Sequence, residues 1–151
     1  MTDRVTGRAA ALGLVLLIAA TAPARAQDAE RYRLVELGGS ALPVQVEQEW
    51  RCREYVTEAL LTLGADSLWS LQYTKRERCG DREELETEHE DGRYTVAADT
   101  IRFHDDDGDD DRDWDLGRDL DLDELATATR GAGGTLTGRL RDGKTTVLFR
   151  R

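Results

Sequence analysis

Two cysteines are the side chains whose chemistry the sequence predicts most directly. Cys52 and Cys79 are the only cysteines in the 151-residue chain. Two cysteines in an oxidising compartment usually pair, and a hairpin that turns through Ala65-Asp66 would place these two opposite each other. A metal site would need more cysteine or histidine ligands nearby, and a redox site usually has a Cys-x-x-Cys motif. We therefore predict a Cys52–Cys79 disulfide.

An acidic segment is the second candidate for chemistry. From Asp105 to Glu124 the chain holds twelve acidic residues and two arginines, a net charge of −10. Alternate aspartates around a glycine turn can supply the oxygens that Ca²⁺ prefers. The candidate ligands are Asp105, Asp107, Asp109 and Asp111. An EF-hand loop counted from Gly108 fails, because Phe103 and Trp114 fall at ligand positions, so we expect a solvated, self-repelling insert in place of a calcium site.

No arrangement of residues in the sequence is typical of a catalytic site. His89 and His104 are the only histidines, and although a zinc site is an open alternative, nothing in the sequence fixes both in one place. No Ser/His/Asp or Cys/His order stands out, and acidic residues are too abundant to single out a catalytic pair. Gly131–Gly134 lacks the following Lys-Ser/Thr of a phosphate loop. We expect a protein that is not an enzyme and needs no cofactor.

The first 26 residues have the features of a signal peptide. Arg4 and Arg8 precede the apolar run Ala9–Ala20, and Ala24-Arg25-Ala26 offers the small side chains that signal peptidase recognises. A membrane anchor is the alternative, but a run of twelve apolar residues is too short to span a bilayer. We predict cleavage before Gln27 and a mature protein that is soluble and extracytoplasmic, either periplasmic or secreted.

Charge and hydropathy exclude two classes of partner. The net charge is −10, and nucleic-acid phosphates repel such a chain. No run of about 18 apolar residues exists, so a membrane-spanning helix is not expected. We expect residues 27–151 to form a single domain that carries the Asp-rich insert at 105–124.

Short segments of alternating polarity, separated by turn residues, follow one another along the mature chain. Turn chemistry recurs at Gly64-Ala65-Asp66-Ser67 and at Asp142-Gly143, where an Asp-Gly pair between alternating segments predicts a hairpin. Segment 120–128 fits a strand or a short helix, and we prefer the strand. The other predicted strands are 32–37, 41–48, 55–63, 68–74, 83–90, 93–96, 101–103, 134–141 and 145–149.

The segment 83–90 is highly polar, and Asp91-Gly92 is expected to end it. A turn at Gly80-Asp81 would place this segment beside the preceding strand, with opposite charges facing each other. The expected cross-strand pairs are Arg78–Glu83 and Lys75–Glu86. We interpret the segment as a solvated outer face.

Eight to ten short strands with frequent turns predict an all-β barrel or sandwich. Alternation selects the side chains that point inward. The interior candidates are Tyr32, Leu34, Leu61, Leu63, Trp69, Leu71, Tyr73, Tyr94, Val96, Ile101, Phe103, Leu136, Leu140, Val147 and Phe149. Because several are bulky, we expect a filled core with at most a shallow pocket.

Four short motifs are spread over most of the mature chain. They are Tyr32-x-Leu34-x-x-Leu37-Gly38-Gly39-x-x-Leu42-Pro43, Leu61-Thr62-Leu63-x-x-Asp66-Ser67-x-Trp69, Gly92-Arg93-Tyr94-Thr95-Val96-x-x-Asp99-Thr100-Ile101-x-Phe103 and Phe149-Arg150-Arg151. Together they resemble small exported bacterial lipocalin-like β-barrel proteins. The resemblance implies an antiparallel up-and-down barrel and no shared catalytic residues. Ser67 stands where that pattern usually has glycine, and the Asp-rich insert has no counterpart in it.

The leading hypothesis is a non-enzymatic, lipocalin-like protein that binds a small apolar ligand or a protein partner. The alternative is an interaction or inhibitor protein that uses the acidic 105–115 loop to bind a basic partner or a cation such as calcium. A carboxylate-based hydrolase is a third, less favoured class.

Overall fold

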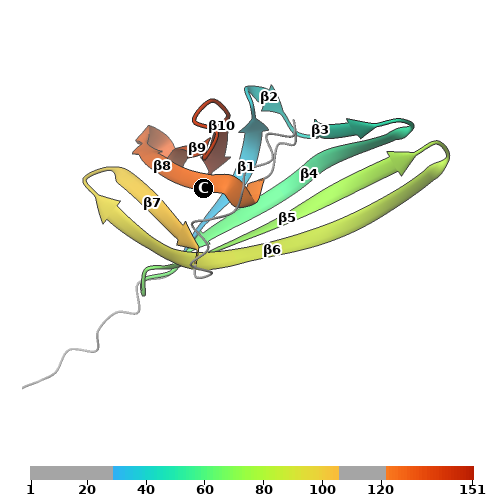
Figure 1. The fold of residues 1–151 in the computed structure, drawn as a ribbon. Coiled ribbons are helices and arrows are strands. Elements are labelled where there is room, and N and C mark those ends of the chain that lie inside the picture. Colours follow the sequence, from blue (N-terminus) through green and yellow to red (C-terminus); the bar gives the residue numbers. More distant parts are fainter. Residues whose placement is uncertain (1–28, 106–121) are drawn as a thin grey trace, which may run out of the picture.

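Ten β-strands form one antiparallel sheet in the computed structural model, which describes residues 29–105 and 122–151 (Figure 1). The predicted signal peptide, residues 1–26, and positions 106–121 of the Asp-rich insert lie outside the described residues. No helix in the described ranges is long and apolar enough to cross a membrane. The strands are β1 (Glu30–Leu37), β2 (Ser40–Ala41), β3 (Val44–Glu49), β4 (Cys52–Leu63), β5 (Leu68–Cys79), β6 (Arg82–Ala97), β7 (Thr100–Asp105), β8 (Leu125–Gly131), β9 (Thr135–Leu140) and β10 (Thr146–Arg150).

Pairing between β1 and β4 closes eight of these strands into a barrel. The sheet runs in the order β2-β1-β10-β9-β8-β7-β6-β5-β4-β3, and β1 also pairs with β4 from Glu30↔Leu63 to Arg33↔Leu60. Consecutive strands from β4 to β10 are neighbours, and β2 and β3 stand outside the ring. The prediction of an all-β antiparallel barrel is confirmed.

Apolar side chains that alternate along the strands occupy the middle of the barrel. The rings of Trp69 and Phe103 meet edge to face with centroids 5.5 Å apart, and Tyr73 and Phe149 are fully buried in the same core. Thirteen of the fifteen predicted interior residues are buried. Tyr94 is half-buried and packs against this core, while its hydroxyl donates a hydrogen bond to the carbonyl of Gly64 at 2.6 Å.

Val96 is the exception among the predicted interior residues, because its side chain is 51% exposed. Strand β5 begins at Leu68, which pairs with Arg93 of β6. Val96 therefore extends past the start of β5 and has no β5 neighbour to cover it. Its inward position is correct by alternation, but its predicted burial is wrong.

Strand β6 is continuous over 16 residues, so the prediction that Asp91-Gly92 ends a strand is wrong. Gly92 pairs with Trp69 in the β5–β6 ladder. A Cβ atom at Gly92 would lie 2.3 Å from the carbonyl oxygen of His104 and 2.9 Å from Nε1 of Trp69. Glycine is needed here because the buried indole and the neighbouring backbone approach closely, and no turn forms.

Segment 120–128 contains both of the structures considered for it. Leu122–Glu124 is a short 3-10 turn, and β8 begins at Leu125. The preference for a strand is therefore wrong for 122–124 and correct from Leu125 onward. Leu122 and Leu125 are both fully buried in the core. The 3-10 turn therefore keeps its leucine inside the barrel although it is not part of a strand. A second 3-10 turn, Ala132–Gly134, joins β8 to β9.

Strands β4, β5 and β6 continue beyond the barrel and form a projecting arm together with β3. Strand β3 pairs with the first half of β4 from Val44↔Val56 to Glu49↔Cys52, and the β5–β6 ladder runs on to Cys79↔Arg82. We call residues 44–56 and 75–91 the arm, which Figure 1 shows extending away from the barrel as the far ends of β3, β4, β5 and β6.

Candidate functional site

The inner face of the arm is a direct continuation of the barrel interior. Side chains alternate across a strand, and Trp69, Leu71 and Tyr73 of β5 point into the barrel and are buried. The next odd-numbered residues of β5, Lys75 and Glu77, therefore lie on the same face of the sheet. The cross-strand register carries this face onto β3, β4 and β6.

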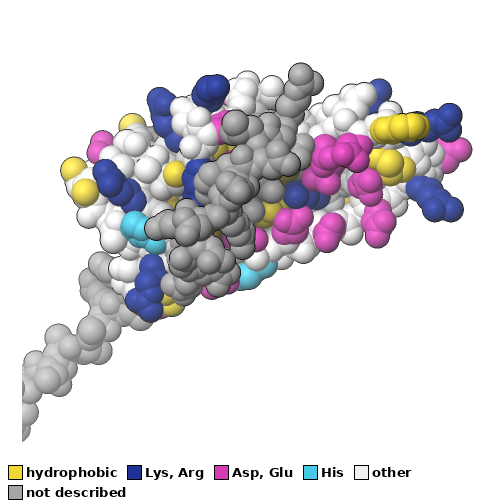
Figure 2. Space-filling model, in the orientation of Figure 1, with side chains coloured by type: hydrophobic (Ala, Val, Ile, Leu, Met, Phe, Trp, Pro, Cys, Tyr) yellow, Lys and Arg dark blue, Asp and Glu magenta, His cyan; other side chains and the backbone are white. Residues whose placement is uncertain are grey.

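Eight glutamates share the inner face of the arm, and we call them the acidic face. Among the described residues of this face, the basic side chains are those of Lys75 and Arg82. Figure 2 shows Asp and Glu side chains gathered over the arm. The acidic face consists of Glu47 and Glu49 on β3, Glu54 on β4, Glu77 on β5, and Glu84, Glu86, Glu88 and Glu90 on β6.

The outer face of the arm has the opposite character. Arg53 pairs with Arg78, which pairs in turn with Glu83, and the next row contains Arg76. The guanidinium of Arg76 lies 5.5 Å from the centre of the Tyr55 ring. The acidity is therefore a property of one face of the arm and does not follow from the low overall pI of 4.7 alone.

A hollow of about 180 Å³ lies on the acidic face near the tip of the arm. Trp50, in the β3–β4 turn, is 100% exposed beside it. Carboxylates bind ammonium and guanidinium groups through charge-assisted hydrogen bonds, and an indole ring attracts the same cations. The hollow therefore has the chemistry to hold a lysine or arginine side chain. Its lining consists of Glu47, Glu49, Trp50, Cys52, Glu54 and Glu77.

Lys75 anchors the acidic face at the base of the arm. Its Nζ atom lies 3.0 Å from Oε1 of Glu88 and 3.4 Å from Oε1 of Glu54. Glu88 also accepts a hydrogen bond from the Tyr73 hydroxyl. Burial raises the pKa of the Glu88 carboxyl, but the hydrogen bonds from Tyr73 and Lys75 and the Lys75 charge outweigh burial, so this pKa lies below its ordinary value of 4.5.

The lowered pKa of Glu88 predicts a pH-dependent contribution to stability. A carboxyl whose pKa is lower in the folded than in the unfolded state stabilises the fold above its unfolded pKa, and this stabilisation is lost as the pH falls through the folded pKa. We expect Glu88→Gln to unfold more easily than the wild type at neutral pH. We expect the difference in unfolding free energy to shrink below pH 4.5, the ordinary pKa of this carboxyl.

Chemical denaturation of both proteins across this pH range measures the effect. Glu86→Gln is the matched control, because it removes the same charge from the neighbouring position on the same strand and the same face. A Glu88→Gln deficit that stays constant down to pH 3 would contradict the prediction.

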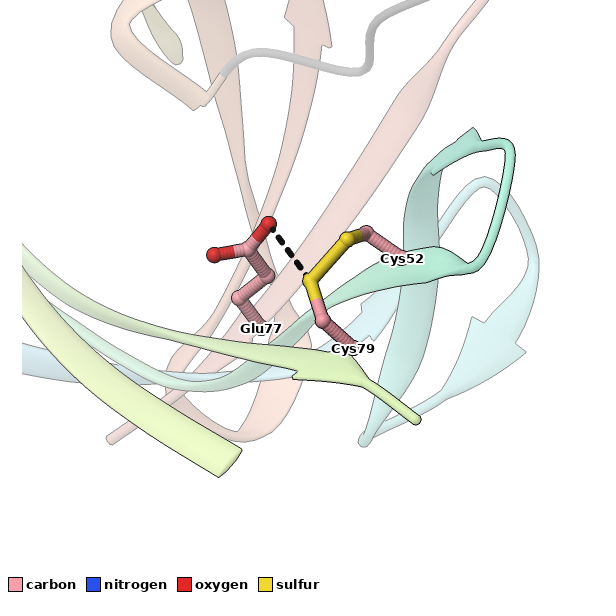
Figure 3. Close-up of a disulfide and its surroundings, with 3 residues drawn as sticks. All are labelled: Cys52, Glu77 and Cys79. Carbon is pink, nitrogen blue, oxygen red and sulfur yellow. Dashed lines mark hydrogen bonds between the residues drawn. A yellow bond between two sulfur atoms is a disulfide. The ribbon is translucent and has the colours of Figure 1, made fainter. Parts of the chain in front are cut away.

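The predicted Cys52–Cys79 disulfide is confirmed and closes the arm near its tip. The two residues pair directly across β4 and β5, with Cα atoms 4.1 Å apart. Oε1 of Glu77 lies 3.2 Å from Sγ of Cys79 (Figure 3). Because a disulfide sulfur carries no proton, this contact becomes a hydrogen bond only in the dithiol. These three side chains could hold a metal only after reduction, since the disulfide uses both sulfurs.

The other candidate ligands do not form one site in the described structure. Asp105 ends β7, and the remaining calcium candidates, Asp107, Asp109 and Asp111, lie outside the described residues. The calcium hypothesis thus stays a prediction. His89 pairs with Gln72 and His104 pairs with Arg93, and the metal-ligating group found in the described ranges includes neither histidine.

A groove of about 400 Å³ lies on the barrel wall, where β1 and β4 separate. Strand β4 pairs with β1 up to Leu60 and with β3 from Val56 toward the arm. Three residues of β4 lie between these stretches, and the first of them, Thr57, forms a bulge in the β4–β5 ladder. The groove is lined by Arg33, Leu34, Leu42, Thr57, Glu58, Ala59, Leu60, Gln72 and Thr74.

The acidic face was not predicted, although the sequence contains a signal for it. Its polarity alone indicates that segment 83–90 is a solvated outer face. However, Lys75 alternates in step with Trp69 and Tyr73, so its side chain is on the same face as theirs. The predicted Lys75–Glu86 pair then places Glu86 on the inner face as well. The structure confirms this pair and the Arg78–Glu83 pair. The alternation of side chains along 68–79, together with the predicted pairing of this strand with 83–90, is sufficient to locate the glutamates of β6 on the inner face.

Comparisons with known proteins leave the fold and the site as the basis for interpretation. No protein-family model matches this chain. No curated protein and no solved structure matches it either.

Proposed function

We propose that this protein is a non-enzymatic, extracytoplasmic, lipocalin-like barrel whose acidic face binds a basic protein partner. The observation that carries the proposal is the placement of eight glutamates on one face of the arm, with arginines on the opposite face. The extracytoplasmic location rests on the signal peptide predicted at residues 1–26.

The dimensions of the acidic face favour a macromolecular partner. Neighbouring strands lie about 4.8 Å apart and residues rise about 3.3 Å along a strand. The acidic face therefore extends roughly 14 Å across four strands near the tip of the arm, and roughly 20 Å along β6 from Glu84 to Glu90. A single metal ion would contact only a small part of this area. Several lysine or arginine side chains on one partner could pair with it together.

The barrel interior is a poorer candidate for the binding site. Trp69, Tyr73, Phe103 and Phe149 are all buried in the core cluster, where side chains of an eight-stranded barrel leave room for one small ligand at most. The Asp105–Glu124 stretch adds further negative charge to the chain. This sequence feature supports a basic partner in the same way as the acidic face does.

A matched pair of triple variants tests the proposal. The test variant combines Glu54→Gln, Glu77→Gln and Glu86→Gln on the acidic face. The control combines Glu36→Gln, Glu58→Gln and Asp99→Asn, which remove the same charge from surfaces outside the arm. Binding of a fluorescent octalysine peptide is measured by anisotropy at low ionic strength.

We expect the test variant to bind octalysine about tenfold more weakly than the wild type, since three exposed ion pairs contribute roughly 0.2–1 kcal/mol each. The control should change binding by less than about twofold, because its charges lie elsewhere. Equal affinities of the two triple variants, or no binding by the wild type, would contradict the proposal.

A small amphipathic ligand is the second candidate, and the groove between β1 and β4 favours it. Apolar side chains of Leu42 and Leu60 line this groove beside the charged groups of Arg33 and Glu58. A polarity-sensitive apolar dye should gain fluorescence with the wild type and lose that gain with Leu60→Gln if the groove is a ligand site.

A further inference from the structure

Within the described residues, no strand pairs with the outer edge of β6 along the arm. Strand β7 pairs with β6 only from Gly92↔Asp105 to Ala97↔Thr100. From Arg82 to Asp91, β6 has a strand partner on one side, β5, and none on the other within the described part of the chain. An unpaired edge presents a row of backbone N–H and C=O groups that can pair with an added strand.

Two observations identify the residues whose backbone groups face this open edge. The N–H of Tyr94 donates to the carbonyl of Ser67 at 2.8 Å, on the β5 side. The ladder from Tyr94 back to Arg82 has no register shift, so even-numbered residues of β6 direct their backbone groups toward β5 and odd-numbered ones direct theirs outward.

The disulfide gives the same result independently. A Cα separation of 4.1 Å at Cys52–Cys79 is typical of a pair that is not hydrogen-bonded across β4 and β5. Cys79 therefore directs its backbone groups toward β6, where it pairs with Arg82. Counting in steps of two from Arg82 again leaves the odd-numbered residues Glu83, Leu85, Thr87 and His89 facing the open edge.

Side chains next to this edge define the segment that would fit. The even-numbered residues Glu84, Glu86 and Glu88 belong to the acidic face, whereas Leu85 lies on the outer face and is 65% exposed. A strand added beside β6 would place every second side chain next to glutamates. The other side chains would lie next to Leu85 and Thr87.

We propose that the open edge of β6, from Glu83 to His89, binds an extended segment of the partner by strand addition, and that this segment carries a basic residue at every second position. This inference rests on the proposed function, because it assigns the binding mode of the same basic partner. Backbone hydrogen bonds supply affinity in such a complex, and the alternate side chains supply specificity.

A second copy of this chain does not fit the same edge. Antiparallel pairing of two β6 strands would bring glutamates of the two acidic faces together, and like charges directly opposite each other are destabilising. Charged side chains on an edge protect sheets against pairing with themselves. The edge is thus open to a basic strand and closed to its own copy.

Four peptides of equal charge test the inference on the wild-type protein. The first alternates lysine and threonine over eight residues. The second has the same composition, with four lysines followed by four threonines. The third is the alternating peptide with N-methyl groups on the threonines. The fourth carries N-methyl groups on the lysines instead, because either set of residues could direct its backbone amides toward β6.

We expect the alternating peptide to bind about tenfold more tightly than the block peptide and than at least one of the methylated peptides. If all four peptides bind equally well, strand addition is refuted while the proposed function stands. If none binds, both the inference and the proposed function are refuted.

Leu85→Pro tests the same edge from the protein side. Proline removes the outward N–H of Leu85 and leaves the hydrogen bonds between β5 and β6 intact. Edge strands tolerate proline at positions whose N–H points away from the sheet. Leu85→Ala is the matched control, since it keeps this N–H. We expect Leu85→Pro to weaken the alternating peptide several-fold and to leave the block peptide unaffected, with Leu85→Ala close to the wild type. Unchanged binding by a folded Leu85→Pro variant would overturn the inference.

Discussion

Replacing Trp69 by alanine is expected to lower the free energy of unfolding by about 3–5 kcal/mol. The indole is only 2% exposed and packs edge to face on Phe103. Its Nε1 atom also donates to the carbonyl of His104 at 3.4 Å. Alanine would leave a cavity in the middle of the barrel and remove this bond. Denaturant titration followed by circular dichroism measures the loss without relying on tryptophan fluorescence.

Trp50→Ala is the matched control for this change. It removes the same ring from a position that is 100% exposed, so its unfolding free energy should stay within about 0.5 kcal/mol of the wild type. Its binding of basic peptides should weaken, because Trp50 borders the hollow on the acidic face. If Trp69→Ala is as stable as Trp50→Ala, the assignment of Trp69 to the core is wrong.

The double variant Cys52→Ser/Cys79→Ser is expected to lose about 3–4 kcal/mol of stability. The disulfide joins residues 27 positions apart, and closing a loop of that length removes chain entropy from the unfolded state by about this amount. Unfolding should begin in the arm, because the bond ties β4 to β5 beyond the barrel. Hydrogen exchange of arm amides, together with denaturant titration, measures both effects.

Reduction of the wild type provides the control for the cysteine variant. Dithiothreitol should lower the stability of the wild type toward that of the double variant and should leave the double variant unchanged. Peptide mapping without reductant should first recover the linked Cys52 and Cys79 peptides. A double variant with the same denaturation midpoint and slope as the oxidised wild type would show that the bond does not contribute to stability.

Local sequence was sufficient to predict much of the β4–β6 pairing. Turn residues and alternating polarity predicted Arg78–Glu83 and Cys52–Cys79, and the structure contains both pairs. The disulfide pairing depends on two irregularities that offset each other. Leu63 pairs with Trp69, one step away from the simplest register, and the bulge between Val56 and Glu58 restores it before Cys52. Turn chemistry alone does not reveal such a bulge.

Tertiary contacts explain what the sequence could not predict. Gly92 has the composition of a turn together with Asp91, but the carbonyl of His104 and the Trp69 indole require glycine inside a strand. These neighbours come from β7 and β5, so no local pattern contains them. The arm itself was also not predicted, because strand length and the point where β7 leaves β6 depend on pairing between segments distant in the sequence.

Closure of the barrel has a consequence for the order in which the chain can fold. Hairpins from β4 to β7 join neighbouring segments and can form as soon as their residues are available. Strand β1, in contrast, pairs with β10 at Arg33↔Arg150, so the ring cannot close before the final strand has been synthesised. Until then β1 and β9 are both unpaired on one side, and such edges expose a growing chain to aggregation. Pairing of the five residues of β10 with β1 and β9 therefore ends the period in which these edges are exposed.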